Sequence, residues 1–224
     1  MNKFLFPILA VVLGVLIASL SKYKKTWNTK LLLSFSGAFL LALTLFELLP
    51  EVYNHLDAKL TGLYIMCGIM LQIILELFSK GAEHGHVHIH KNETNFPWLL
   101  FISLCIHSIL EGFPINQHND MVYGVLVHKI PIATLISIFL LNSKYDKFQI
   151  AAFLIAFTFM TPLGTLISHN WEAIADFAHI INAIVIGIFF HISTTILFES
   201  SEGHKFNLSK FIAIILGVGV AYFI

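Results

Sequence analysis

Long apolar runs separated by short polar segments extend along the whole chain of 224 residues. A helix that crosses the hydrocarbon core of a bilayer needs roughly 20 consecutive apolar residues, and eight segments approach this length. Runs of this kind predict helices, because transmembrane β-strands are about 10 residues long and alternate in polarity. The predicted helices cover residues 4–20, 30–50, 60–79, 97–115, 121–141, 149–168, 173–198 and 208–224.

The composition of the chain is typical of a membrane protein. Hydrophobic residues make up 57% of it and charged residues 12%, whereas soluble globular domains have about 25% charged residues. A signal peptide is an alternative for the first run, but the "KYKK" that follows favours a spanning helix with its C-terminal end in the cytoplasm. We therefore predict an all-α polytopic membrane protein in which residues 1–224 form a single domain.

The basic residues predict how the helices are oriented. Eight helices place both termini on one side of the membrane, and cytoplasmic connections carry an excess of Lys and Arg. All 13 basic residues are lysines, and with both termini outside most of them fall inside. The inside lysines are then Lys22, Lys24, Lys25, Lys30, Lys80, Lys91, Lys144, Lys147, Lys205 and Lys210, against Lys3 and Lys59 outside and Lys129 within a helix.

Ionisable side chains within the predicted helices are the candidate functional residues, because they are costly at membrane depth. His107 and Glu111 are four residues apart, which places both on one face of a helix, about 6 Å apart along its axis. His128 follows the next short connection at a matching distance, so it reaches a similar depth on the neighbouring helix. Glu47 lies near the outer end of the second helix and somewhat shallower.

Proline accompanies each of these helices. A proline lacks an N–H, so the carbonyl four residues earlier loses its helical hydrogen bond, and such a carbonyl is tolerated at membrane depth only inside protein or beside a wet cavity. The freed carbonyls belong to the residue just before a candidate ligand. The pairs are Glu47 with Pro50, Glu111 with Pro114, and His128 with Pro131.

Two imidazoles and two carboxylates suit a divalent transition metal. Such ligands favour zinc, and also iron(II), manganese or cadmium, over calcium or magnesium, which prefer oxygen alone. The remaining ionisable groups have simpler interpretations: Glu76 extends toward the cytoplasmic end of its helix, and His179 and His191 are packing histidines. His55, His118 and His169 fall in outside loops, where solvated surface is the simpler interpretation.

The connection 80–96 is the single compositionally biased segment and is predicted to be cytoplasmic. Its "EHGHVHIH" contains His84, His86, His88 and His90, and histidine-rich tracts bind metal weakly and reversibly. We treat these four as accessory metal ligands or as part of a plain polar linker. The net charge of zero offers no basic face for nucleic acid. The expected partners are therefore the lipid bilayer and a metal ion, and the chain is compatible with a homodimer.

Two classes of function other than plain metal binding could use the same residues. An intramembrane zinc protease would need a motif such as H-E-x-x-H, which the chain lacks. A membrane haem or redox protein would need paired axial histidines at matched depths. Neither is favoured, so the chain is not expected to be an enzyme.

"HSILEG", followed on the next helix by "HKIP", resembles the Zrt/Irt-like proteins, the ZIP family of divalent metal transporters. "LFELLPE" resembles the second-helix motif of that family, and the histidine-rich loop between the third and fourth helices is similar too. The resemblance implies eight helices with external termini. It also implies transport of zinc or a related ion toward the cytoplasm by alternating access, with one helix group moving against another.

The same resemblance implies which residues bind the metal: His107, Glu111, His128 and, less directly, Glu47 in place of the usual histidine. The chain departs from the family pattern where many members have residues for a second metal ion. Lys129, Ser108 and Ile132 occupy those places. We therefore expect one metal ion, with the Lys129 ammonium replacing the second cation. The small size of the connections and the lysine-only basic set suggest a bacterial inner membrane.

Overall fold

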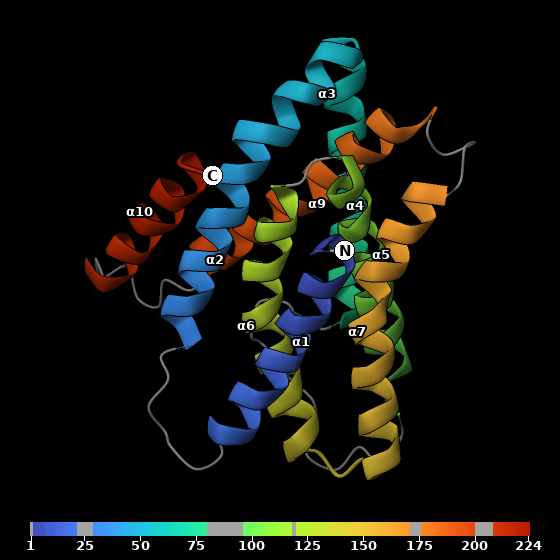
Figure 1. Ribbon diagram of the computed structural model, residues 1–224, viewed down its shortest axis with the longest axis vertical. Coiled ribbons are helices and arrows are strands. Elements are labelled where there is room, and N and C mark those ends of the chain that lie inside the picture. The colour runs from blue at the N-terminus through green and yellow to red at the C-terminus, as the bar shows by residue number, and fades with distance from the viewer. Residues whose placement is uncertain (1, 22–28, 80–95, 118–119, 171–175, 200–207) are drawn as a thin grey trace.

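The computed structural model describes residues 2–21, 29–79, 96–117, 120–170, 176–199 and 208–224, and all regular structure within these ranges is helical. Figure 1 shows the helices gathered into one elongated bundle, with α7 and α10 at opposite edges. The helices are α1 Asn2–Ser21, α2 Thr29–Leu43, the π-helical η1 Thr44–Leu48, α3 Leu49–His55, α4 Ala58–Ser79, α5 Trp98–Gln117, α6 Met121–Asn142, α7 Lys147–Asn170, α9 Ala178–Glu199 and α10 Leu208–Tyr222.

Seven of the described helical segments are long and apolar enough to cross a membrane. The segment from Lys30 to His55 counts as one of them, because α2, η1 and α3 follow one another without a break. The eighth predicted helix is present as α10, with 15 residues. The chain is therefore an all-helical, multi-pass membrane protein, as the apolar pattern predicted.

The prolines leave the helices continuous. Before Pro50, the backbone widens into the five-residue π-helix η1, and the N–H of Leu49 donates to the carbonyl of Thr44. A π-turn holds one more residue than an α-turn, so the extra residue is absorbed and the second helix extends to His55, beyond the predicted end at residue 50. Pro114 and Pro131 lie inside α5 and α6, which continue past them.

The helices pack in two groups. α1 packs on α6 and α7, and α5 packs on α7; α2 packs on α10 and α9, and α4 packs on α9. Small residues allow such contacts between membrane helices: a Cβ at Gly68 would lie 1.9 Å from the carbonyl oxygen of Ile184, and one at Gly187 would lie 2.0 Å from that of Ile65. The two groups meet where α2 contacts α6 and where α4 and α9 contact α5.

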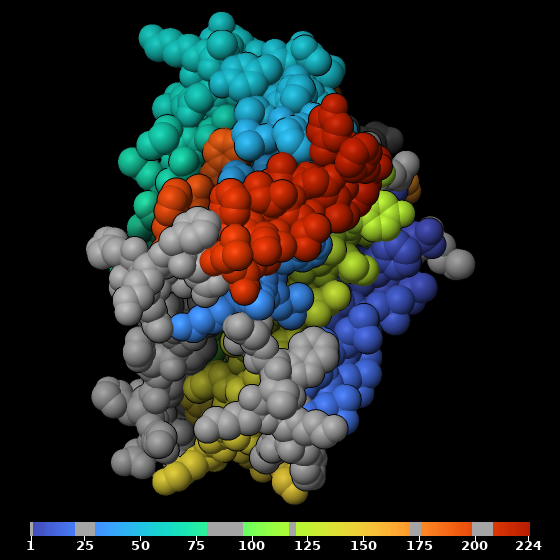
Figure 2. All heavy atoms as spheres, turned by 90° about the vertical axis from the view of Figure 1, so that its left-hand side faces the viewer, coloured from blue at the N-terminus to red at the C-terminus, as the bar shows by residue number. Residues whose placement is uncertain are grey.

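The outer surface of the bundle is apolar. α4 alone exposes Leu60, Leu63, Met66, Met70, Ile73, Ile74 and Leu77, and a soluble protein rarely exposes a patch of this extent. In Figure 2, α10 crosses the face turned toward the viewer and lies in front of α2, on which it packs. Lipid chains are the solvent that such a surface fits.

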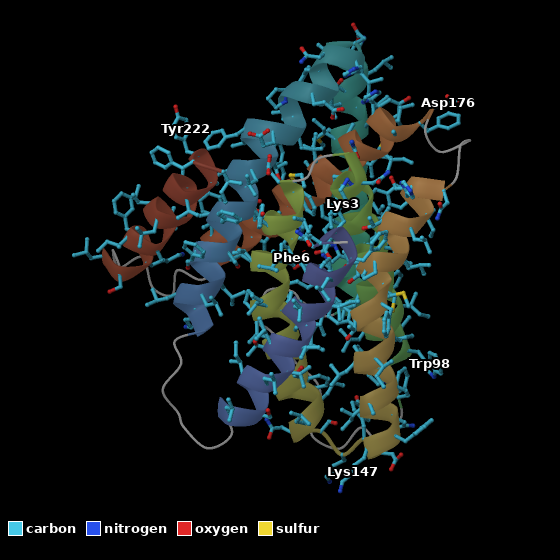
Figure 3. The ribbon with its side chains drawn as sticks, viewed as in Figure 1. Lys3, Phe6, Trp98, Lys147, Asp176 and Tyr222 are labelled. Carbon is cyan, nitrogen blue, oxygen red and sulfur yellow. The ribbon has the colours of Figure 1, made fainter. Side chains whose placement is uncertain are left out.

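Hydrogen bonds identify which helix ends lie together. The ammonium of Lys3 donates to the carbonyl of Asn116 (2.6 Å), and the Asn116 amide donates to the carbonyl of Ser168 (3.3 Å). The start of α1 and the ends of α5 and α7 therefore share one end of the bundle, here called the upper end. Because consecutive spans alternate in direction, α3 ends and α9 begins at this end as well. Figure 3 shows Asp176 there and Lys147 at the opposite end.

Candidate metal centre

Three of the predicted ligands meet between α5 and α6. His107 lies in the middle of α5, Glu111 one turn later, and His128 on the adjoining part of α6. One ligand atom from each lies within 4.8 Å of the others. His107 is 2% exposed, and Glu111 and His128 are 1% exposed, so the cluster is enclosed by protein.

The distances within the cluster fit a small metal ion. Oε1 of Glu111 is 2.9 Å from Nε2 of His107 and 3.7 Å from Nε2 of His128. Two ligands held by zinc at about 2.0–2.2 Å and the tetrahedral angle are roughly 3.3–3.5 Å apart. The two distances bracket this value, so both imidazole–carboxylate separations are close to those of ligands that share one ion.

Lys129 occupies the other side of the same carboxylate. Its ammonium is 2.7 Å from Oε2 of Glu111, donates to the Ser108 hydroxyl at 3.1 Å, and lies 4.7 Å from the centre of the Phe157 ring. An ammonium that is 1% exposed needs such partners, because burying an unpaired charge is costly. Glu111 therefore turns one oxygen toward the two histidines and the other toward a fixed positive charge.

A third helix completes the surroundings of the carboxylate. The Thr161 hydroxyl on α7 donates to Oε2 of Glu111 at 3.4 Å. This approach depends on two glycines: a Cβ at Gly112 would lie 2.3 Å from the carbonyl oxygen of Thr161, and one at Gly164 would lie 1.9 Å from that of Ile109. The sequence reasoning missed Thr161 and Phe157. The glycines in each of the two helices were the available signal that α5 and α7 touch.

Glu47 lies apart from the cluster. It is exposed, within the π-helical turn η1, and it is not among the metal-binding groups formed by the described residues. Ser108 is fully buried, and its hydroxyl accepts a hydrogen bond from Lys129. His84, His86, His88 and His90 lie outside the residues that the structure describes.

Two further histidine–carboxylate contacts involve residues that the sequence treated individually. His191 on α9 lies 2.5 Å from Oε2 of Glu76 on α4, so Glu76 pairs with a neighbouring helix instead of only extending toward the membrane surface. Glu51 and His55 of α3 meet His179 of α9 in a second group with ligand spacing. Sequence spacing could not bring these together, because they depend on which helices are neighbours.

The fold and the cluster define a class: a multi-pass helical membrane protein with histidine and carboxylate side chains gathered between its spans. Comparison with known proteins agrees with this description. The family model described as ZIP Zinc transporter matches residues 79–224. The chain therefore belongs to the ZIP zinc transporter family, as the motifs on the fourth and fifth predicted helices indicated. Because this family consists of transporters, the expectation that the chain is not an enzyme is confirmed.

Individual relatives agree with the family match. Zinc transporter ZIP1 of Plasmodium falciparum is 27% identical over 163 residues, which are 65% of this chain and 46% of that protein. Zinc transporter ZIP1 of Takifugu rubripes is 28% identical over 151 residues, which are 62% of this chain and 50% of that protein. Zinc transporter ZIP1 of Danio rerio is 29% identical over 89 residues, which are 37% of this chain and 30% of that protein. The chain spans half or less of the length of these relatives. They come from eukaryotes, so the bacterial inner membrane stays a prediction of the sequence.

Proposed function

We propose that this chain carries divalent transition-metal ions, zinc first, across a membrane toward the cytoplasm. The observation that carries the proposal is the convergence of His107, Glu111 and His128 on one buried point inside a bundle of apolar spans. Ionisable groups at membrane depth mark ion pathways. Membership of a zinc transporter family supports the same function.

The ligand set indicates which ions the site would accept. Two imidazoles and one carboxylate leave a fourth position for water, which is the arrangement of exchangeable zinc sites. Iron(II), manganese and cadmium are the other ions that this set would accept, whereas magnesium and calcium prefer oxygen ligands alone. Zinc is therefore the substrate to test first.

Alternating access is the proposed mode of transport. All three ligands, with Lys129 and Thr161, belong to the group formed by α1, α5, α6 and α7, so the whole site can move as one body. Glu47 belongs to the other group. We propose that it contacts the ion at a stage when the two groups are displaced from their arrangement in this structure.

Lys129 has two proposed roles. Its ammonium fills the space beside Oε2 of Glu111 and so keeps the site to one metal ion. It also repels that ion, because like charges at this separation destabilise each other even with partial screening. A transport site must release its ion, and this repulsion weakens binding without removing a ligand.

The remaining expectations have their own tests. External termini place the upper end of the bundle outside. Cysteines introduced at Lys3 and Lys147 test this: a thiol reagent that does not cross the membrane should label the first from outside and not the second. The four histidines of the 80–96 connection are proposed to receive metal on the cytoplasmic side. A homodimer would appear as a protein mass of two chains by light scattering in detergent.

The central experiment measures zinc uptake into proteoliposomes that contain a zinc-sensitive dye. Wild type should transport zinc, and Glu111→Gln, which preserves shape but removes the charged ligand, should not. Glu76→Gln is the matched control, because Glu76 also faces a histidine across two helices but lies outside the cluster. It should retain most of the uptake.

Three outcomes would contradict the proposal in different ways. Equal uptake by wild type and folded Glu111→Gln would remove the assignment of this site. Loss of uptake in both variants would show that the requirement for a carboxylate is not particular to this cluster. Absence of uptake of zinc, iron(II) and manganese by wild type, together with a haem absorption band in the purified protein, would favour the redox alternative.

A further inference from the structure

A second group of metal-binding side chains lies where α3 ends and α9 begins. Glu51 and His55 are one turn apart on α3, which places them on the same face, and His179 is the second residue of α9. One ligand atom from each of the three lies within 4.8 Å of the others. We propose that these residues form a separate, exchangeable site for a divalent transition-metal ion at the upper end of the bundle.

The hydrogen bond of His55 orients its ring as in a metal-binding histidine. Its Nδ1 is 2.9 Å from the backbone carbonyl of Glu51, and a carbonyl oxygen can only accept, so Nδ1 carries the hydrogen. The lone pair of the neutral ring is then on Nε2, and it is free of that contact. Metal-binding histidines commonly donate their other N–H to a backbone carbonyl in this way, which fixes the tautomer and the ring.

The other two side chains complete the set. Nδ1 of His179 is 3.4 Å from Oε1 of Glu51, close to the roughly 3.3–3.5 Å between two ligands of one zinc ion. The rings of His55 and His179 stack with centroids 4.0 Å apart and planes inclined by 8°. Because a nitrogen lone pair lies in the plane of its ring, one of the two rings would have to rotate for both histidines to bind a shared ion.

The exposure of this group differs from that of the buried cluster. The side chains of His179 and Glu51 are 33% and 23% exposed, and His55 is exposed, whereas the ligands between α5 and α6 are nearly inaccessible. An ion could reach the upper site without any movement of helices. Two imidazoles, one carboxylate and open positions for water suit zinc and allow rapid exchange.

The location suggests what the site does. α9 packs against both α3 and α5, so the helix that supplies His179 also contacts the helix that supplies His107 and Glu111. The upper end is also the end at which α5 finishes. We therefore infer that this site gathers the ion at the mouth of the bundle. That delivery role rests on the proposed transport function, but metal binding at the site does not.

The competing explanation is a structural contact. An ion pair and a ring stack could simply hold α3 against α9. In that case the three side chains would support the folded state but would not respond to zinc. The experiment must therefore measure the protection of each histidine separately, because the buried cluster and the histidine-rich connection are also proposed to bind metal.

The test is residue-resolved chemical modification of the full chain in detergent. Diethyl pyrocarbonate reacts with accessible imidazoles, and mass spectrometry quantifies the product at each histidine during a zinc titration. Micromolar zinc should protect His55 and His179 together. His169 is the internal control, because it is exposed at the same end of the bundle but outside the group. Glu51→Gln should raise the zinc concentration for half-protection by at least about tenfold.

Each outcome decides the proposal. Protection that is weakened by Glu51→Gln, and at His179 by His55→Ala, supports a three-ligand site. Protection no greater than that of His169 at millimolar zinc, or protection unaffected by both substitutions, would overturn it and leave the structural contact. For delivery, His55→Ala should raise the KM for zinc uptake several-fold with little change in kcat, relative to His169→Ala. An unchanged KM would overturn delivery while the protection result stands on its own.

Discussion

Replacing Lys129 with methionine should tighten zinc binding and slow transport. Methionine matches the length of the lysine stem and fills the space beside Phe157, but it removes the ammonium that is 2.7 Å from Oε2 of Glu111. The carboxylate then faces the metal ion without a competing cation. Binding should become stronger because a repulsion is lost, and release should become slower for the same reason.

The magnitude follows from the geometry of the carboxylate. An ion bound to Oε1 of Glu111 at about 2 Å would lie roughly 5 Å from the Lys129 nitrogen on Oε2. Charges of +2 and +1 at that separation repel by about 2 kcal/mol at the dielectric constant of water and by about 7 kcal/mol at an effective value of 20. Because about 1.4 kcal/mol is a factor of ten in Kd, we expect at least a tenfold lower Kd.

The assay is a competition titration of purified protein against a zinc-sensitive dye. His55 of the upper site and the loop histidines His84, His86, His88 and His90 are changed to serine in every variant, so that the titration reports the buried cluster. Lys129→Arg is the matched control, because it preserves the positive charge and should leave the Kd within about threefold of wild type. Uptake in proteoliposomes gives the rate. A Kd for Lys129→Met within about twofold of wild type, with unchanged stoichiometry and rate, would refute the electrostatic argument.

Further predictions concern the surroundings of the site. Thr161→Val removes a weak hydrogen bond to the site carboxylate, so the zinc Kd should change by less than about tenfold in the same titration. Gly164→Val forces a side chain into a facing backbone carbonyl, and overpacking of this kind costs about 1–3 kcal/mol. The midpoint temperature of thermal unfolding in detergent should therefore fall by several degrees. Ala152→Val, at an exposed position on the same helix, should not lower that temperature. Glu47→Gln should slow uptake but leave equilibrium zinc binding unchanged, because Glu47 is outside the cluster in this arrangement; a loss of binding would contradict that placement. Deleting residues 80–95 should change the uptake rate only modestly, and complete loss of uptake would show that the histidine-rich segment is essential.

Much of the fold could be predicted because the bilayer restricts the choices. Hydrocarbon thickness fixes helix length, so the apolar runs located the spans, and most described helix ends lie within a few residues of the predictions. The second helix ends later than predicted, since Pro50 was expected near its end and the π-turn carries it on to His55, and the seventh begins at Ala178 and not at residue 173. A proline reveals where a hydrogen bond is lost, but not how the backbone compensates.

The candidate cluster could be predicted only as far as local geometry reaches. The four-residue spacing of His107 and Glu111 and the matched depth of His128 depend on one helix and its immediate neighbour. Thr161 and the group at His179 depend instead on contacts between helices that are distant in sequence. For Thr161, close approaches at Gly112 and Gly164 allow that contact. Periodicity shows which face of a helix is apolar, but it does not show which partner covers that face.

The π-turn at Thr44–Leu48 has a consequence for how this segment is compared with others. The π-turn absorbs one extra residue. Relative to an uninterrupted α-helix, every side chain after it is therefore shifted by about 100° around the helix axis. A helical wheel drawn through residues 29–55 as one α-helix would therefore give the wrong phase to every side chain after Leu48, including Glu51 and His55. A related chain that is one residue shorter here could have an ordinary α-turn and still present the same two faces. A single-residue gap in an alignment at this place would then mark a change in winding and not the loss of a functional position.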